Sequence, residues 1–155
     1  MDKRLTFIAE LARRSGEYTV VDCGCDHGKV PYYLLAANDG CRVVAIDKSA
    51  PSLNKARELL AEFKDRVRFE CASGLECLRD ERFAVLIISG IGGHNILEIL
   101  TASKAVFDKL ILSPHRDADL VIEWLVSNGY EIRAEHKLQN RGKNYTILEA
   151  KKQLL

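Results

Sequence analysis

Residues 20–28 read Val20-Val21-Asp22-Cys23-Gly24-Cys25-Asp26-His27-Gly28, and the expected fold follows from them. A β-branched run ends in an acidic residue, and a glycine-bearing turn then leads into the apolar segment 29–37. This pattern predicts a strand over residues 18–23, a tight turn and a helix that tolerates Pro31 in its first turn. Glycine lets a ligand approach the backbone, and the start of a helix offers unpaired N–H groups, so the turn favours a nucleotide-like ligand.

The residues of this turn also indicate the charge of the ligand. Gly24 is followed by Cys25 and Asp26, and only Gly28 comes after them, so the dinucleotide pattern G-x-G-x-x-G is absent. Asp22 and Asp26 place two carboxylates at the turn, which attract ammonium and sulfonium groups and repel phosphates. A nicotinamide dehydrogenase is therefore the weakest alternative.

The rest of the chain predicts alternating strands and helices. Hydrophobic periodicity indicates strands over 41–46, 67–72, 83–89 and around 110–112, and helices over 5–12, 51–63, 93–103 and 118–127. This order predicts a parallel sheet with right-handed crossovers. The last two strands, 130–138 and 145–151, are joined by a turn at 140–144 so short that they must pair antiparallel. We therefore predict an α/β fold in which residues 1–155 form a single domain, with a mostly parallel sheet and one antiparallel strand near its edge.

Three further segments bring candidate functional residues to the carboxyl edge of this sheet. Asp47 ends the second strand about twenty-five residues after the first turn, where such folds hold a ribose diol through an acid. Three glycines within 89–94 open a helix at the edge where open sheets bind ligands. The fifth strand ends in Ser113-Pro114-His115-Arg116, which adds an imidazole and a guanidinium. Each feature also has a structural alternative: capping or a salt bridge for Asp22, turn formation for Asp47 and the glycines, and a structural role for His115.

The composition limits the class of protein. The chain has 23 Lys and Arg against 22 Asp and Glu, and a net charge of +1 supplies no global field that would attract nucleic acid. No apolar stretch is long enough for a signal peptide or a membrane span, which predicts a cytoplasmic protein with reduced cysteines. Cys23, Cys25 and His27 lack a fourth ligand at the usual spacing, so we expect no metal.

Several motifs together identify a resemblance that covers residues 5–150. They are Asp22-x-Gly24-x-Asp26-His27, Ser89-Gly90-Ile91-Gly92-Gly93, the Ser113-Pro114 strand end, Glu123-Trp124-Leu125 and the Gly142-Lys143-Asn144-Tyr145 turn. With these motifs the chain resembles the TrmK family, bacterial tRNA methyltransferases that act on N1 of adenine at tRNA position 22. The resemblance implies a Rossmann-like class I methyltransferase fold, S-adenosylmethionine as cofactor and tRNA as substrate.

We expect the cofactor to be bound by Asp22, Gly24, Asp47, Lys48, Ser73, Gly74 and Gly90, and catalysis to involve Asp26, His27 and His115. Two of these positions differ from the family, which usually has Asp at the place of Ser73 and Asn at the place of His115. The helical C-terminal extension of the family is missing from a chain that ends at Leu155, so we expect tRNA recognition to be weak or to arise from another surface.

The predicted reaction is in-line methyl transfer from S-adenosylmethionine to a ring nitrogen of RNA, with positioning as the main source of rate. The sequence has no Asn-Pro-Pro-aromatic segment and no Pro-Cys nucleophile, which disfavours exocyclic amines and carbon-5 of pyrimidines as acceptors. Two other classes stay open, a small-molecule methyltransferase and a cofactor-binding module without catalysis. The oligomeric state is also open, with a homodimer among the alternatives.

Overall fold

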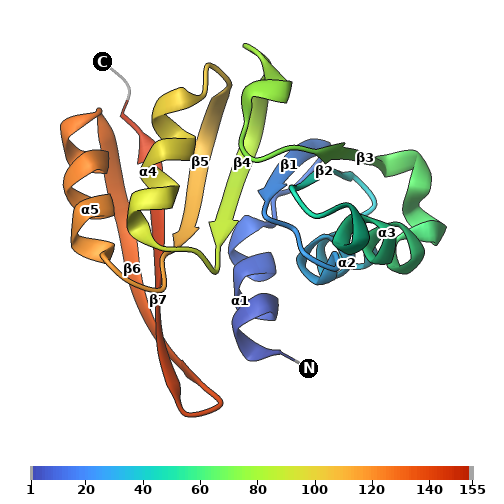
Figure 1. Cartoon of the computed structure of the whole chain (residues 1–155), viewed down its shortest axis with the longest axis horizontal. Coiled ribbons are helices and arrows are strands. Elements are labelled where there is room, and N and C mark those ends of the chain that lie inside the picture. Colours follow the sequence, from blue (N-terminus) through green and yellow to red (C-terminus); the bar gives the residue numbers. More distant parts are fainter. Residues whose placement is uncertain (1, 154–155) are drawn as a thin grey trace.

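The structure, a computed structural model, describes residues 2–153. Its strands form one sheet in the order β3-β2-β1-β4-β5-β7-β6 (Figure 1). Their bounds are β1 Tyr18–Cys23, β2 Cys41–Asp47, β3 Val67–Cys71, β4 Arg82–Ser89, β5 Val106–Ser113, β6 Tyr130–Asn140 and β7 Lys143–Lys152. β1 to β5 run parallel, whereas β7 pairs antiparallel with both β5 and β6. The predicted α/β fold is confirmed, because β7 alone runs against the other described strands and lies next to the edge.

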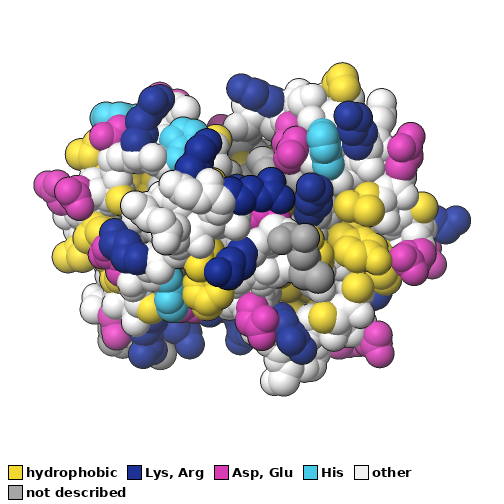
Figure 2. All heavy atoms as spheres, turned by 90° about the horizontal axis from the view of Figure 1, so that it is seen from below, with side chains coloured by type: hydrophobic (Ala, Val, Ile, Leu, Met, Phe, Trp, Pro, Cys, Tyr) yellow, Lys and Arg dark blue, Asp and Glu magenta, His cyan; other side chains and the backbone are white. Residues whose placement is uncertain are grey.

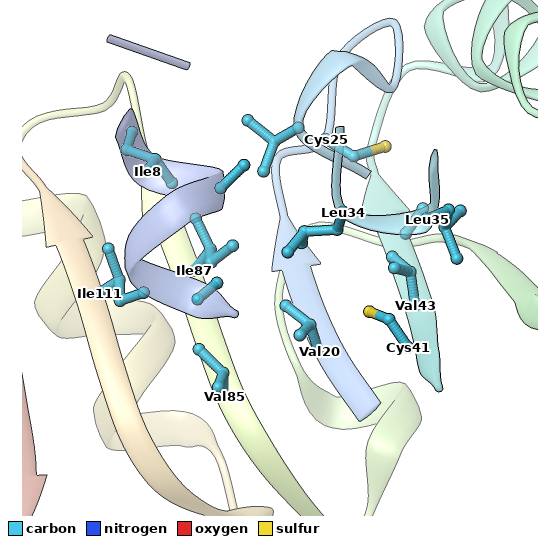
Figure 3. Close-up of a cluster of buried hydrophobic side chains, with 14 of the residues drawn as sticks. Ile8, Val20, Cys25, Leu34, Leu35, Cys41, Val43, Val85, Ile87 and Ile111 are labelled. Atoms are coloured by element: carbon cyan, nitrogen blue, oxygen red, sulfur yellow. The ribbon is translucent and has the colours of Figure 1, made fainter. Parts of the chain in front are cut away.

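Helices cover both faces of the sheet. α1 (Lys3–Ala12), α2 (Lys29–Ala37) and α3 (Ala50–Leu59) pack on one face, and α4 (Gly93–Ala102) and α5 (Ala118–Ser127) pack on the other. Figure 3 shows the first of these two cores, in which Ile8 of α1 lies against Ile87 and Ile111 of the sheet. None of the helices in the described part of the chain combines the length and the hydrophobicity that crossing a membrane requires.

The helix predicted over residues 51–63 is shorter in the structure. α3 ends at Leu59, and a 3-10 segment follows over Ala61–Arg66. The backbone angles of Leu60, which lies between them, are outside the helical range, with φ −97° and ψ 13°. The guanidinium of Arg66 then donates hydrogen bonds to the main-chain oxygens of Leu35 and Cys41, both at 3.0 Å. These tertiary contacts draw the chain toward α2 and β2, and hydrophobic periodicity carries no information about them.

The C-terminal hairpin is confirmed, with longer strands and a shorter turn than predicted. β6 and β7 pair as far as Asn140 and Lys143, with one shift of register between Ile132 and Ala134, so the turn consists of Arg141 and Gly142 alone. Both turn residues have positive φ, 53° and 77°, the combination that type I′ turns need to match the twist of the strands. The hairpin extends beyond the rest of the sheet on the side of the α1 N-terminus (Figure 1).

β1 lies where the order of the strands reverses. The chain passes from β1 to β2 on one side, and β4 later pairs with the other side of β1. The connections that follow β1 and β4 therefore leave on opposite faces of the sheet, as α2 and α4 show. Such a reversal opens a crevice at the carboxyl ends of the two strands, where open α/β sheets bind ligands.

Candidate functional site

A pocket of about 560 Å³ lies at the carboxyl ends of β1, β2, β3 and β4. It is lined by residues that follow these strands and by parts of α1, α2 and α4, namely Arg4, Leu5, Asp22, Cys23, Gly24, Cys25, Asp26, His27, Lys29, Val30, Asp47, Lys48, Ala72, Ser73, Ser89, Gly90, Ile91, Asn95, Glu98 and Ile99. β4 and β5 end toward the bottom of Figure 1, and Figure 2 shows the molecule from that side. Lys and Arg side chains gather around the middle of this face (Figure 2).

Gly24 and Asp47 connect the turns after β1 and β2. Gly24 has φ +87°, a conformation that residues with a Cβ rarely adopt, and its N–H donates to the oxygen of Ile46 at 2.8 Å. The Asp47 carboxylate accepts the main-chain N–H of Asp26 on Oδ2 and that of Ser49 on Oδ1, both at 2.9 Å. These bonds hold the carboxylate in one orientation, and each oxygen keeps a lone pair for a further donor.

Asp22 is the buried acid of the pocket, with 3% of the residue exposed. Burial raises the pKa of its carboxyl to about 7, and the negative charges of Asp47 and Asp26 act in the same direction. A carboxyl whose ionisation is opposed in this way gains from a positively charged ligand, which would stabilise the ionised form. Perturbed acids in a crevice are typical of functional sites.

We expect Asp22 to make the stability of the free protein depend on pH between about 4 and 7. The unfolded chain loses this proton near the ordinary pKa of 3.8 and the folded chain only near 7, so the stabilisation is complete below 3.8 and is lost as the pH rises through 7. Asp22→Asn should remove this contribution, which changes the difference in unfolding free energy between variant and wild type by roughly 2–4 kcal/mol from pH 4 to pH 8. Urea unfolding of both proteins at several pH values measures it, and a constant difference would contradict the expectation.

The glycine loop after β4 is held by the segment that follows β5. The N–H of Gly90 donates to the oxygen of Ser113 at 3.2 Å, and the N–H of His115 donates to the oxygen of Ile91 at 3.1 Å. His115 therefore supports the wall of the pocket through its main chain. The imidazole of His115 is not part of the pocket lining among the residues described.

The pocket brings together most of the residues predicted from the sequence, namely Asp22, Gly24, Asp26, His27, Asp47, Lys48, Ser73 and Gly90. Oδ1 of Asp26 lies 3.6 Å from Nε2 of His27, and both side chains reach solvent. Within residues 2–153, Gly74 and His115 lie outside the lining. The roles assigned to all ten residues stay predictions.

Sequence reasoning missed the contributions of α1 and α4. Asn95 and Glu98 line the pocket from α4, three residues apart and therefore on one face of the helix. Their spacing directly after the glycine loop is a signal that could have found them. Arg4 of α1 carries no such signal, because only tertiary packing brings the first helix to the turn after β1.

Within the described range 2–153, no group of three or more His, Cys, Asp or Glu side chains is arranged to hold a metal ion. Cys23 is buried, and burial raises the pKa of its thiol to about 12. Because the thiolate is the form that ligates metals, this environment disfavours ligation by Cys23.

Comparisons with known proteins show the family of the chain. The model of a family described as a methyltransferase domain matches residues 1–148. The tRNA (adenine(22)-N(1))-methyltransferase of Bacillus subtilis is 28% identical over 155 residues, which cover 97% of this chain and 64% of that protein.

Two solved structures have the same fold. The crystal structure of the B. subtilis m1A22 tRNA methyltransferase TrmK matches with a TM-score of 0.86 and 25% identity, over 99% of this chain and 67% of that one. Streptococcus pneumoniae Sp1610 in complex with S-adenosyl-L-methionine matches with a TM-score of 0.85 and 26% identity, over 100% of this chain and 75% of that one. The resemblance to TrmK is thereby confirmed over nearly the whole chain. Since the family match also spans all but the last few residues, this protein belongs to the methyltransferase domain family.

Proposed function

We propose that this protein transfers a methyl group from S-adenosylmethionine to N1 of an adenine in tRNA. The observation that carries the proposal is the glycine turn with Asp22 and Asp47 at the tips of neighbouring strands, beside the reversal of strand order. This arrangement favours a positively charged nucleoside over a phosphate-bearing dinucleotide. The named activity of the B. subtilis relative and the ligand of Sp1610 support the same cofactor and substrate.

The pocket suits each part of this cofactor. Its volume of about 560 Å³ lies within the usual range of small-molecule sites. Asp47 offers its remaining lone pairs to the ribose hydroxyls, and Lys48 and Ser73 border the side proposed for the adenine. Gly74 follows Ser73 in the sequence and lies outside the lining. Asp22, Gly24 and Gly90 border the side proposed for the charged amino-acid end. Apart from Gly24 itself and its two neighbours in the chain, no residue has an atom within 4 Å of the place of a Gly24 Cβ, so the backbone there is open to a ligand.

The proposed reaction transfers the methyl group directly and forms no covalent bond to the protein. When bound, S-adenosylmethionine supplies a methyl group whose bond to sulfur breaks as its bond to the attacking nitrogen forms. N1 of adenine attacks with its own lone pair, so no proton has to leave first, and the adenine ring takes over the positive charge. Asp26 and His27 orient the base, and one of them either faces this charge as it develops or takes a single proton from the exocyclic amine after the transfer, which leaves the methylated base neutral. Positioning then supplies most of the rate, to which His115 contributes by holding the glycine loop.

Binding of tRNA is proposed to rely on local charge. The net charge of +1 gives no general attraction for RNA, but basic side chains gather on the face that holds the strand ends (Figure 2). We also propose the cytoplasm as the location of the protein, because its proposed substrate is tRNA.

Incubation of the purified protein with methyl-labelled S-adenosylmethionine and unmodified total tRNA tests the proposal. We expect the label to appear in 1-methyladenosine after digestion of the tRNA to nucleosides, and tRNA that already carries this modification serves as the control. Label in a different nucleoside would overturn the assigned acceptor. Transfer to a metabolite extract instead of RNA would indicate a small-molecule enzyme, and cofactor binding without any transfer would indicate a binding module.

A further inference from the structure

The tip of the C-terminal hairpin, residues 137–146, carries positive charge without any acid. It contains Lys137, Arg141 and Lys143 and no Asp or Glu. These three charges exceed the net charge of +1 of the whole chain, so the rest of the protein is net negative. Nζ of Lys137 lies 2.9 Å from Oε2 of Glu135 just outside the tip. Within residues 2–153, the exposed side chains of Arg141 and Lys143 have no ion pair, so both cations are available to an external anion.

Arg141 occupies a turn position that its residue type does not favour. It is the first of the two turn residues and has φ +53°, and Gly142 follows with φ +77°. Type I′ turns prefer Asn, Asp or Gly at this first position, because these residues tolerate the left-handed conformation best. An arginine therefore gives the turn itself no advantage. Residues kept in such a conformation are often functional, which points to a role of the guanidinium outside the turn.

Side-chain contacts with α1 fix the hairpin tip in place. The guanidinium of Arg4 stacks over the ring of Tyr145, 4.9 Å from the ring centroid. Nδ2 of Asn140, next to the turn, donates a hydrogen bond to Oδ1 of Asp2 at 3.1 Å. A polar turn that only contacts water needs no such connection to another element. Because the tip is held by α1, its two unpaired cations are oriented before any partner binds.

The hairpin tip lies beside the pocket and outside it. Arg4 and Leu5 of α1 line the pocket, so Tyr145 adjoins its wall. Gly142 precedes Tyr145 by three residues, which places the turn roughly 10 Å farther along the strand. The hairpin extends past the strand ends on the side of the α1 N-terminus (Figure 1), and Lys and Arg side chains gather around the middle of the face seen from that side (Figure 2). A nucleotide in the pocket would therefore have its neighbours near the tip.

We infer that the hairpin tip binds the phosphate backbone of tRNA beside the nucleotide that enters the pocket. This role rests on the tRNA substrate of the proposed function and adds a binding surface outside the pocket. The RNA backbone presents a row of phosphates to Arg141 and Lys143, and a guanidinium can bind a phosphate through two parallel hydrogen bonds. Contacts with phosphates position a nucleic acid without reading its sequence. The hairpin tip therefore sets the affinity for tRNA and leaves the methyl transfer itself to the pocket.

The test is a double variant, Arg141→Asn with Lys143→Gln, titrated with unmodified tRNA by fluorescence anisotropy at several salt concentrations. We expect its affinity at about 100 mM salt to fall by roughly 10- to 30-fold, and the slope of log affinity against log salt to decrease by about 1.5–2. The affinity for S-adenosylmethionine and the kcat at saturating tRNA should stay within about twofold, because neither side chain lines the pocket.

Arg141→Asn alone separates binding from folding. Asparagine suits the first position of a type I′ turn, so the Tm of this variant should equal or exceed that of the wild type. Its affinity for tRNA should nevertheless fall by about three- to sixfold, as expected for one lost phosphate contact. A purely structural role of Arg141 would lower Tm together with the affinity, and this result would overturn the inference.

Lys64→Gln with Lys104→Gln is the matched control, since it removes two exposed positive charges before β3 and β5, at the opposite end of the sheet from the pocket. It should keep the wild-type affinity for tRNA. An equal loss in this control overturns the inference, because only the net charge would then matter. Wild-type affinity and salt dependence in the hairpin double variant also overturn it, and leave the proposed function in place. If the wild-type protein binds no tRNA, the proposed substrate fails and the role of the hairpin tip fails with it.

Discussion

Asp26→Asn is expected to lower the rate of methyl transfer to tRNA by about 100-fold, the order that general acid–base and charge-stabilising groups contribute. The Asp26 side chain is 75% exposed at the mouth of the pocket, so it is free to face an incoming base. The contact of residue 26 with Asp47 is made by the main-chain N–H, which asparagine keeps. Asparagine also tolerates the positive φ of 52° at this position. Only the negative charge is lost.

Affinity for S-adenosylmethionine should stay within about fivefold, because an exposed charge contributes little to binding. Single-turnover kinetics with unmodified tRNA measure the rate, and calorimetry measures the affinity. Asp39→Asn is the matched control, an exposed aspartate in the turn that precedes β2 at the opposite end of the sheet. A parallel loss of cofactor affinity in Asp26→Asn would show that residue 26 acts on the structure of the turn and not on the transferred methyl group.

Gly40→Ala is expected to destabilise the protein by roughly 2–4 kcal/mol, through a steric conflict that the backbone cannot relieve. A Cβ at this position would lie 2.1 Å from the oxygen of Gly16 and 2.9 Å from its carbonyl carbon. Both contacts are to backbone, so no side chain can move aside. The N–H of Tyr18 is hydrogen-bonded to the oxygen of Gly40 at 3.0 Å, and this bond joins the starts of β1 and β2.

Thermal unfolding followed by circular dichroism measures the effect, for which we expect a fall in Tm of about 5–15 °C. Asp39→Ala, one residue earlier in the same turn, adds no steric contact and should change Tm by no more than about 2 °C. A Gly40→Ala protein with the wild-type Tm would contradict this expectation. It would mean that the turns before β1 and β2 can move apart with little loss of folding stability.

The order of the elements could be predicted from the sequence because it depends on local patterns. Continuous apolar strands alternating with helical periodicity indicate a parallel sheet, and a short polar turn permits only an antiparallel hairpin. Asp22 and Asp47 could be found for the same reason. Each follows a strand whose end is visible in the sequence, and the carboxyl ends of parallel strands meet at one edge.

Other features depend on contacts between residues that are distant in the sequence. The close approach of Gly40 to Gly16 and the early end of α3 at Leu59 arise from packing between separate segments, which periodicity does not encode. The same holds for the site. Burial between two layers of helices raises the pKa of the Asp22 carboxyl to about 7, and the docking of α1 onto the hairpin carries Arg4 into the pocket. Local patterns in the chain thus specified the fold and the acidic turn. Burial set the pKa of Asp22 in that turn, and long-range packing brought Arg4 into the same pocket.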